Sequence, residues 1–186
     1  MTQIAEPTPA EPRFGSGDPV VHPSQGAGTI ERIVTLDYTG TPLRYYSIEL
    51  VDSDSTLILP VEKAEELGLR HADFGLDDIE AALDDEPREL PDSYRSRQAQ
   101  MRSLLNTGKP IDLARIVRDM AWRGRQPDTN LTKVDKDLLR DAKHMLATEL
   151  AARLGTTVDA ATRRIEETVG RVMDRHAQAN GSPSAA

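Results

Sequence analysis

The pattern of apolar residues changes once along this chain, near residue 60. Before that point, short runs of β-branched and aromatic residues alternate with turn residues, which is typical of short antiparallel strands. After it, apolar residues recur three and four positions apart, which is typical of amphipathic helices. We therefore predict an α+β protein, with a small, bent antiparallel β domain followed by an all-α helical domain.

Four or five short strands are expected between residues 18 and 60, over residues 19–23, 29–34, 43–51 and 56–59. Gly26 and Gly28 are expected to form a turn, because glycine adopts positive φ at no steric cost. Strands of this length and spacing indicate a small sheet or barrel. About 45 residues are too few to build a large enzyme pocket.

The helical part is expected to contain a short helix over residues 61–67, ended by Gly68, and an acidic helical segment around residues 76–83. Longer helices are expected over residues 93–105, 110–123, 132–154 and 157–176. Thr132 and Asp135 have the spacing of a capping box, and Gly155 is suited to end the helix that they begin. The expected domains are a disordered leader (1–13), a β domain (14–70), an acidic helical connector (71–90), a helical domain (91–178) and a disordered tail (179–186).

Several classes of function are disfavoured by the composition. The chain has no cysteine, which excludes disulfides, thiol catalysis and cysteine-bound zinc. Its four histidines are scattered and accompany no catalytic motif, so we expect neither an enzyme nor a cofactor, metal or small-molecule substrate. No stretch approaches the roughly 18 apolar residues of a membrane span. We expect a soluble cytoplasmic protein without membrane contact.

Charge is segregated along the chain, although the net charge is −8. Between residues 49 and 86, thirteen acidic residues face only Lys63 and Arg70. Between residues 88 and 125 the sign reverses, with nine basic residues against four acidic ones, a local excess of about +5. The basic residues are Arg88, Arg95, Arg97, Arg102, Lys109, Arg115, Arg118, Arg123 and Arg125.

Trp122, the only tryptophan, does not fit the apolar stripe of its expected helix. At 100° per residue that stripe consists of Leu113, Ile116, Val117 and Met120. Trp122 instead shares a face with arginines four and seven positions earlier and, if the helix continues, three positions later. A lone tryptophan is commonly a core residue, and another helix could cover this face. The helical geometry nevertheless predicts an exposed tryptophan among the arginines Arg115, Arg118 and Arg125.

An apolar wedge surrounded by arginines suits the minor groove of DNA. The arginines would hold phosphates, and the wedge would press on a weakened base step. Unstacking costs a few kcal/mol per step, so such a contact favours DNA that is already opening. Because no base-reading pattern is visible, we expect little sequence specificity.

Residues 17–30 (GDPVVHPSQGAGTI) resemble the opening of the CarD/CdnL family of bacterial transcription regulators and of the polymerase-binding module of transcription-repair coupling factors. Residues 45–51 and 57–64 fit the strands that follow in that family. Residues 116–123 (IVRDMAWR) and 131–151 fit the helical domain. The resemblance covers about residues 14–152.

This resemblance implies a Tudor-like domain that binds the β subunit of bacterial RNA polymerase and a helical domain that contacts promoter DNA. It implies that Trp122 wedges into the minor groove at the upstream edge of the transcription bubble and stabilises the open complex. Such a protein would be nucleoid-associated in the cytoplasm. The expected DNA-binding residues are Trp122, Arg95, Arg97, Arg115, Arg118, Arg123 and Arg125.

The sequence departs from the family at two places. Leu36 and Ile58 stand where some members carry arginines that contact the β subunit. The expected polymerase-binding residues are therefore Arg32, Leu36, Arg44 and Ile58, with backbone edge pairing as a further means of docking. Trp122 also lies one residue later than in some members, relative to the preceding Val-Arg pair.

A second function class fits the same residues. In a protein-only adaptor, the β domain would bind a partner while the helices only pack on one another, because an arginine face that binds acidic protein looks the same in sequence. The acidic segment 73–86 could also be a partner site, although a solvated linker is its simpler interpretation. Salt-dependent DNA binding that requires Trp122 and Arg118 would separate the regulator from the adaptor.

Overall fold

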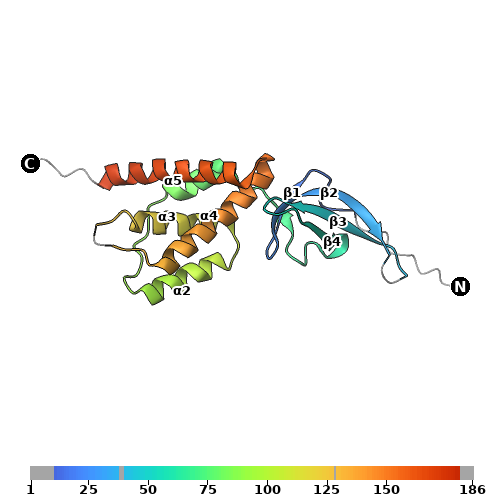
Figure 1. Ribbon diagram of the computed structural model, residues 1–186, viewed down its shortest axis with the longest axis horizontal. Coiled ribbons are helices and arrows are strands. Elements are labelled where there is room, and N and C mark those ends of the chain that lie inside the picture. The colour runs from blue at the N-terminus through green and yellow to red at the C-terminus, as the bar shows by residue number, and fades with distance from the viewer. Residues whose placement is uncertain (1–10, 38–39, 128, 181–186) are drawn as a thin grey trace, which may run out of the picture. The chain divides into compact units, whose positions relative to one another are not determined.

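The computed structural model describes residues 11–37, 40–127 and 129–180. It divides into two compact units, Met1–His71 and Ala72–Ala186. The first contains an antiparallel sheet and the second contains five helices (Figure 1), so the predicted α+β class is confirmed. Most of the expected leader (1–13) and most of the expected tail (179–186) lie outside the described residues.

The β unit is a five-stranded antiparallel sheet in the order β4-β3-β2-β1-β5. A register shift between Ile30 and Arg32 marks a bulge in the long second strand, and such bulges bend a sheet. The last strand has only two residues, too few to produce a sequence signal, and was not predicted. The strands are β1 (Pro19–His22), β2 (Gly26–Leu36), β3 (Leu43–Leu50), β4 (Thr56–Pro60) and β5 (Arg70–His71).

The two glycines of the predicted turn have different roles. Gly26 has φ of +89° and makes the turn into β2, as predicted. Gly28 does not take positive φ; it lies inside β2, opposite Leu50 of β3. A Cβ atom there would come within 2.5 Å of the Glu49 carbonyl oxygen. Glycine is therefore required at position 28 for the close approach of two strands, not for a turn.

The core of the β unit lies against one face of the sheet. Phe14 packs edge-on against Tyr46, with ring centroids 5.7 Å apart, and lies 4.7 Å from the ring of His71. The expected helix over residues 61–67 is reduced to a single 3-10 turn, Val61–Lys63, and Gly68 closes the segment with φ of +85°. The buried residues of this core are Phe14, Val20, Ile30, Tyr46, Ile48, Leu59, Ala64 and Leu69.

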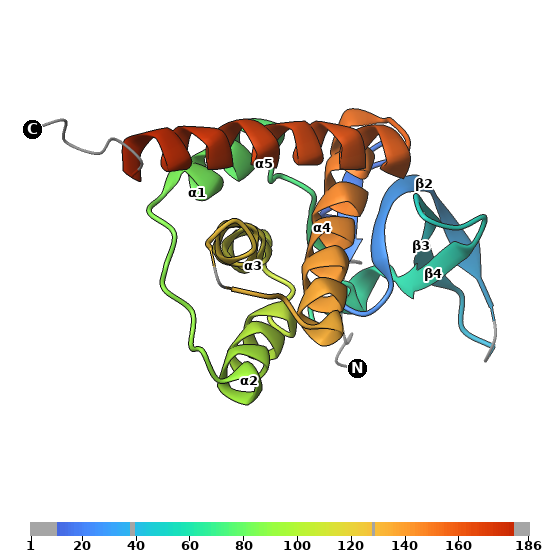
Figure 2. The ribbon, with the colours of Figure 1, turned by 60° about the vertical axis from the view of Figure 1, so that its left-hand side comes forward.

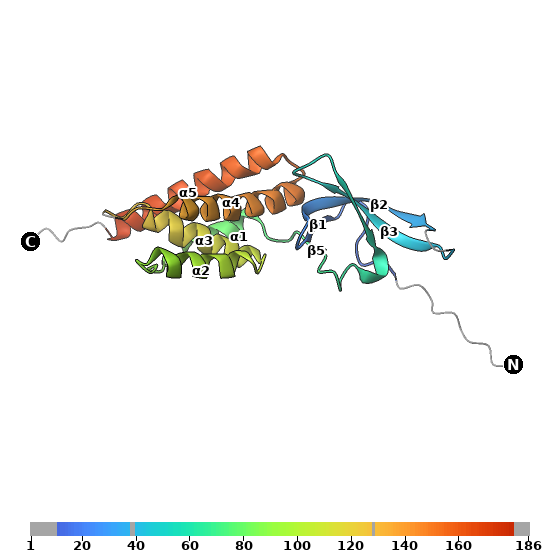
Figure 3. The same cartoon turned by 60° about the horizontal axis from the view of Figure 1, so that its bottom comes forward.

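The helical unit is built around its third helix. α3 packs against all four other helices, and Figure 2 shows it end-on, near the centre of the unit. α2 and α5 lie on opposite sides of α3 (Figures 2 and 3). The helices are α1 (Leu76–Asp84), α2 (Tyr94–Leu105), α3 (Pro110–Arg123), α4 (Lys133–Leu154) and α5 (Val158–Asn180).

The ends of the long helices follow the predicted signals. The Thr132 hydroxyl accepts from the Asp135 N–H at 3.2 Å while the Asp135 carboxylate accepts from the Thr132 N–H at 2.9 Å, which completes the capping box. Gly155 adopts the left-handed conformation at the end of α4. The Thr157 hydroxyl accepts from the Ala160 N–H and caps α5.

The acidic helix α1 belongs to the helical unit and is not a solvated linker. Its apolar residues Ile79, Ala82 and Leu83 are buried against α3 and α5. Its carboxylates pair with arginines of α5, with Arg175 within 3.2 Å of Glu80 and 2.8 Å of Asp84. The acidic pattern of this segment suggested exposure because its cationic partners are far away in the sequence.

Candidate nucleic-acid interface

Trp122 lies outside the core stripe of α3, as its position in the sequence predicted. Leu113, Ile116, Val117 and Met120 form that stripe and are no more than 1% exposed. Trp122 is half-buried near the end of the helix. The indole is thus neither a core residue nor a fully exposed one.

An open hollow of about 350 Å³ lies beside the indole. Part of its wall is the segment between α1 and α2, which Arg123 anchors by donating to the Leu90 carbonyl oxygen and to the Asp92 carboxylate, each at 3.1 Å. From α5, the ring of His176 meets the indole edge-on, with centroids 5.9 Å apart. The hollow is lined by Pro87, Arg88, Glu89, Leu90, Asp92, Trp122, Arg123, Gln126 and Thr129.

Two of the arginines expected at the interface are buried, which contradicts their expected exposure. Arg118 is 2% exposed because α1 covers that turn of α3. Its guanidinium donates to the Asp119 carboxylate at 2.8 Å and to the Ala82 carbonyl oxygen at 3.3 Å. An arginine four residues before Trp122 therefore joins α3 to α1 and does not face solvent beside the indole.

Arg97 is also 2% exposed, inside the contact between α2 and α4. It donates to the Asp135 carboxylate at 2.7 Å and to the Pro91 carbonyl oxygen at 2.8 Å. Burial raises the pKa of Asp135, but the hydrogen bonds from Arg97 and Thr132 outweigh it and leave that pKa below its ordinary value. The pair is a structural link within the bundle.

The remaining predicted arginines are at least partly accessible, and most of them are engaged. Arg115 pairs with Asp112 at 2.8 Å on its own helix, and Arg125 pairs with Asp174 of α5 at 2.5 Å. Arg123 is only 13% exposed. Arg95 is exposed and contacts the ring and hydroxyl of Tyr94.

Ion pairs within the protein therefore neutralise most of the excess positive charge of residues 88–125. Among the residues that the structure describes, five of the six predicted DNA-binding arginines have a carboxylate partner, and Arg95 is the exception. Within the ranges that the structure describes, the exposed basic residues of this segment that pair with no carboxylate are Arg88, Arg95, Arg102 and Lys109.

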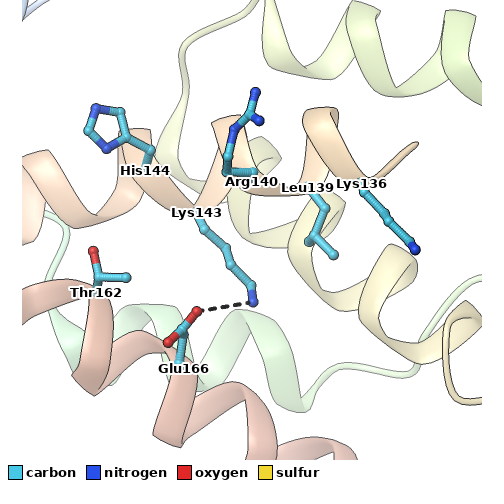
Figure 4. Close-up of a pocket in the computed structure, with 7 residues that line it drawn as sticks. All are labelled: Lys136, Leu139, Arg140, Lys143, His144, Thr162 and Glu166. Atoms are coloured by element: carbon cyan, nitrogen blue, oxygen red, sulfur yellow. Dashed lines mark ion pairs between the residues drawn. The ribbon is translucent and has the colours of Figure 1, made fainter. Parts of the chain in front are cut away.

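A second hollow, of about 290 Å³, lies between α4 and α5 and carries several basic side chains. Lys143 points to Glu166, 3.8 Å away, whereas Arg140 and His144 point in another direction (Figure 4). Arg140 is also held by Asp137 and Asp141 at 2.8 and 2.9 Å. These basic side chains do not converge on one point, so they do not form an anion site.

In the β unit, three of the four expected polymerase-binding residues share one face of the sheet. Arg32 and Ile58 lie on either side of Ser47 in the strand register, and Leu36 lies opposite Leu43. These positions alternate with the core residues, so they occupy the outer face. Ile58 is 40% exposed and Leu43 38%.

Arg44 does not join this face. It lies opposite Thr35, one position out of step with the outer-face residues, and therefore on the side of the core. Of the other three residues, Ile58 lies on β4, an edge strand of the sheet, whereas Arg32 and Leu36 lie on β2, on the far side of β3. Such an edge can pair with a strand of another chain.

The fold defines a two-domain α+β protein with a half-buried tryptophan at the end of its central helix. Comparison with known protein families shows the family to which it belongs. Residues 14–72 match the family model described as the CarD-like/TRCF RID domain, and residues 78–166 match the model of the CarD C-terminal domain. The chain belongs to the CarD-like family.

A relative in Bacillus subtilis (strain 168) is named "Putative transcription factor YdeB". It is 27% identical over 153 residues, an alignment that covers 77% of this chain and 94% of the relative. The first matched segment, residues 14–72, corresponds to the β unit, and the second, residues 78–166, lies within the helical unit, which extends beyond it.

Neither a membrane span nor a metal cluster is found among the described residues. No helix there is long and apolar enough to cross a membrane. No group of three His, Asp or Glu side chains in the same residues could hold a metal ion.

Proposed function

We propose that this protein regulates transcription by binding bacterial RNA polymerase through its β unit and promoter DNA through its helical unit. Membership of the CarD-like family and the similarity to a protein named as a transcription factor support a role in transcription. The observation that carries the DNA contact is Trp122, an apolar side chain left half-buried beside an open hollow.

In this proposal the indole enters the minor groove at the upstream edge of the bubble, where base steps are already weakened. Arg95 and Arg125 are the predicted arginines best placed to hold phosphates, since Arg97 and Arg118 are buried. DNA would have to compete with Asp174 for Arg125. Trp122 therefore contributes most of the free energy of DNA binding, and contacts to phosphates contribute little.

DNA of two kinds tests this proposal: a duplex, and the same sequence with a pre-opened bubble. The wild type should prefer the bubble, because the unstacking cost of a few kcal/mol is already met there. Trp122→Ala should lose the preference and at least about tenfold in affinity, as expected for a central tryptophan. Leu154→Ala, a truncation of a 44% exposed side chain in the same unit, is the matched control.

For polymerase, the proposed contact is the outer face around Arg32, Leu36 and Ile58, together with the edge of β4. A charge introduced at Ile58 would be buried in such an interface, so Ile58→Asp should weaken binding to the β subunit by about tenfold or more. Leu67→Asp places the same charge on a 43% exposed leucine in the same unit and should have little effect. Calorimetry with the purified β subunit measures both; equal affinities would exclude this face.

The adaptor function is the second candidate, and the ion pairing of the arginines favours it. If the wild type binds neither duplex nor bubble DNA at low salt while polymerase binding persists, the helical unit has no DNA contact and the adaptor function is correct.

A further inference from the structure

The C-terminal half of α5 contacts the end of α3, beyond the residues matched to the family. The matched region ends at residue 166. Past it, His176 meets the Trp122 ring at an interplanar angle of 69°, and Asp174 pairs with Arg125 at 2.5 Å. Arg125 also donates to the Gly170 carbonyl oxygen at 3.5 Å. Two of the predicted DNA-binding residues are therefore held by α5.

His176 is itself fixed on its other side. Its Nε2 atom lies 3.1 Å from the Leu83 carbonyl oxygen. A carbonyl oxygen can only accept, so Nε2 must carry the hydrogen. Leu83 lies in the last turn of α1, where carbonyl oxygens have no partner within the helix. The imidazole thus satisfies a free carbonyl group and is oriented by it.

We propose that His176 is a positioning residue for Trp122, holding the indole in the orientation in which it meets DNA. This inference rests on the proposed DNA contact. A wedge acts on a base step only if its own side chain does not turn away, and ordering a side chain on binding reduces affinity. His176 removes that freedom in advance, because its ring and the indole meet edge to face while α1 holds the imidazole.

Asp174 supports the same arrangement at the level of the backbone. Its pair with Arg125 ties the residue three positions after Trp122 to α5, just past the end of α3. Arg125 is 39% exposed and Asp174 66%, so this pair alone contributes little to stability. Its contribution is to keep the end of α3 beside His176.

The test uses the full chain, in which Trp122 is the only tryptophan and its fluorescence reports on this site alone. Quenching by acrylamide is measured without DNA, and affinity is measured on bubble DNA. The variants are His176→Ala, His176→Phe, which keeps a ring edge, and Gln178→Ala, a control at an exposed position of α5. Thermal unfolding by circular dichroism identifies any variant that fails to fold.

His176→Ala should raise the acrylamide quenching constant of Trp122 and lower DNA affinity about two- to tenfold, the range expected for loss of one aromatic contact. His176→Phe should recover part of both properties, and Gln178→Ala should match the wild type. Recovery by phenylalanine distinguishes positioning from a general loss of stability.

Unchanged quenching in a folded His176→Ala protein would overturn the inference. So would increased quenching with full DNA affinity, because the orientation would then not matter for binding. If the wild type has no DNA affinity, the proposed function fails, and the quenching data alone then decide whether His176 positions the indole.

Discussion

Arg97 has one of the largest fully buried side chains in the molecule, and its partner Asp135 is completely inaccessible. Asp135 has two tasks, because it also accepts from the Thr132 N–H and caps α4. The Asp135 carboxylate therefore connects the beginning of α4 to Arg97 of α2. Arg97 in turn holds the segment before α2 through the Pro91 carbonyl oxygen. Such a pair is costly to break, since removing one partner leaves the other charge buried without its counter-ion.

We predict that Arg97→Met lowers the free energy of unfolding of the helical unit by about 3–5 kcal/mol. Arg102→Met makes the same change at an exposed position of the same helix and should cost no more than about 0.5 kcal/mol. Urea unfolding monitored by circular dichroism measures both. Similar midpoints for the two variants would show that the buried pair does not stabilise the bundle.

Because the pKa of Asp135 is lowered, the contribution of the Arg97–Asp135 pair to stability depends on pH. A carboxyl group whose pKa is lower in the folded state stabilises the protein above its unfolded pKa, and this contribution is lost as the pH falls through the folded value. Asp135→Asn should therefore lose stability less steeply than the wild type below about pH 4. Parallel curves of stability against pH would contradict this.

At the scale of single elements, α1 is the segment whose role differs most from its sequence pattern. It presents Ile79, Ala82 and Leu83 to the bundle and its carboxylates to α5. Leu83 is fully buried, and its carbonyl oxygen lies 3.1 Å from His176 Nε2. Helix α1 thus helps to hold Trp122 in place, because it orients the His176 ring that packs on the indole.

Leu83→Ala should destabilise the helical unit by about 2–5 kcal/mol, the usual cost of this change in a core. Leu154→Ala, the same truncation at an exposed site, should be nearly neutral. The midpoint of urea unfolding, followed by the helical circular dichroism signal, decides the matter. An unchanged midpoint for Leu83→Ala would mean that α1 is a solvated connector after all.

Local patterns predicted most of the elements because the signals that set them are local. The capping box at Thr132, the left-handed Gly155 and the stripe of α3 each depend on residues within a few positions of one another. The burial of Arg118 and Arg97 depends on α1 and α4, which meet them only after folding. A helical projection shows which residues share a face but not which neighbour covers it. The contact of His176 with Trp122 had no local signal for the same reason.

For the molecule as a whole, the charge pattern has a consequence for binding. The net charge is −8, and most arginines of the basic segment are paired within the protein. The exposed cations that pair with no carboxylate there, within the described residues, are Arg88, Arg95, Arg102 and Lys109. DNA binding should therefore release few counterions.

We predict that the logarithm of DNA affinity falls with the logarithm of salt concentration with a slope of about −2 to −4. Fluorescence anisotropy on labelled bubble DNA over a salt series gives the slope, and Arg95→Ala should make it shallower by about 1. A slope far steeper than −4 would contradict this account, because it would show that further cations of the protein bind phosphates.

The lifetime of open complexes at a weak promoter, formed by purified bacterial polymerase, tests the central claim most directly. The wild type should lengthen that lifetime, Trp122→Ala should not, and Leu154→Ala should act like the wild type. A lifetime unchanged by saturating wild-type protein, or lengthened equally by Trp122→Ala, would contradict the claim that this protein stabilises the open complex through Trp122.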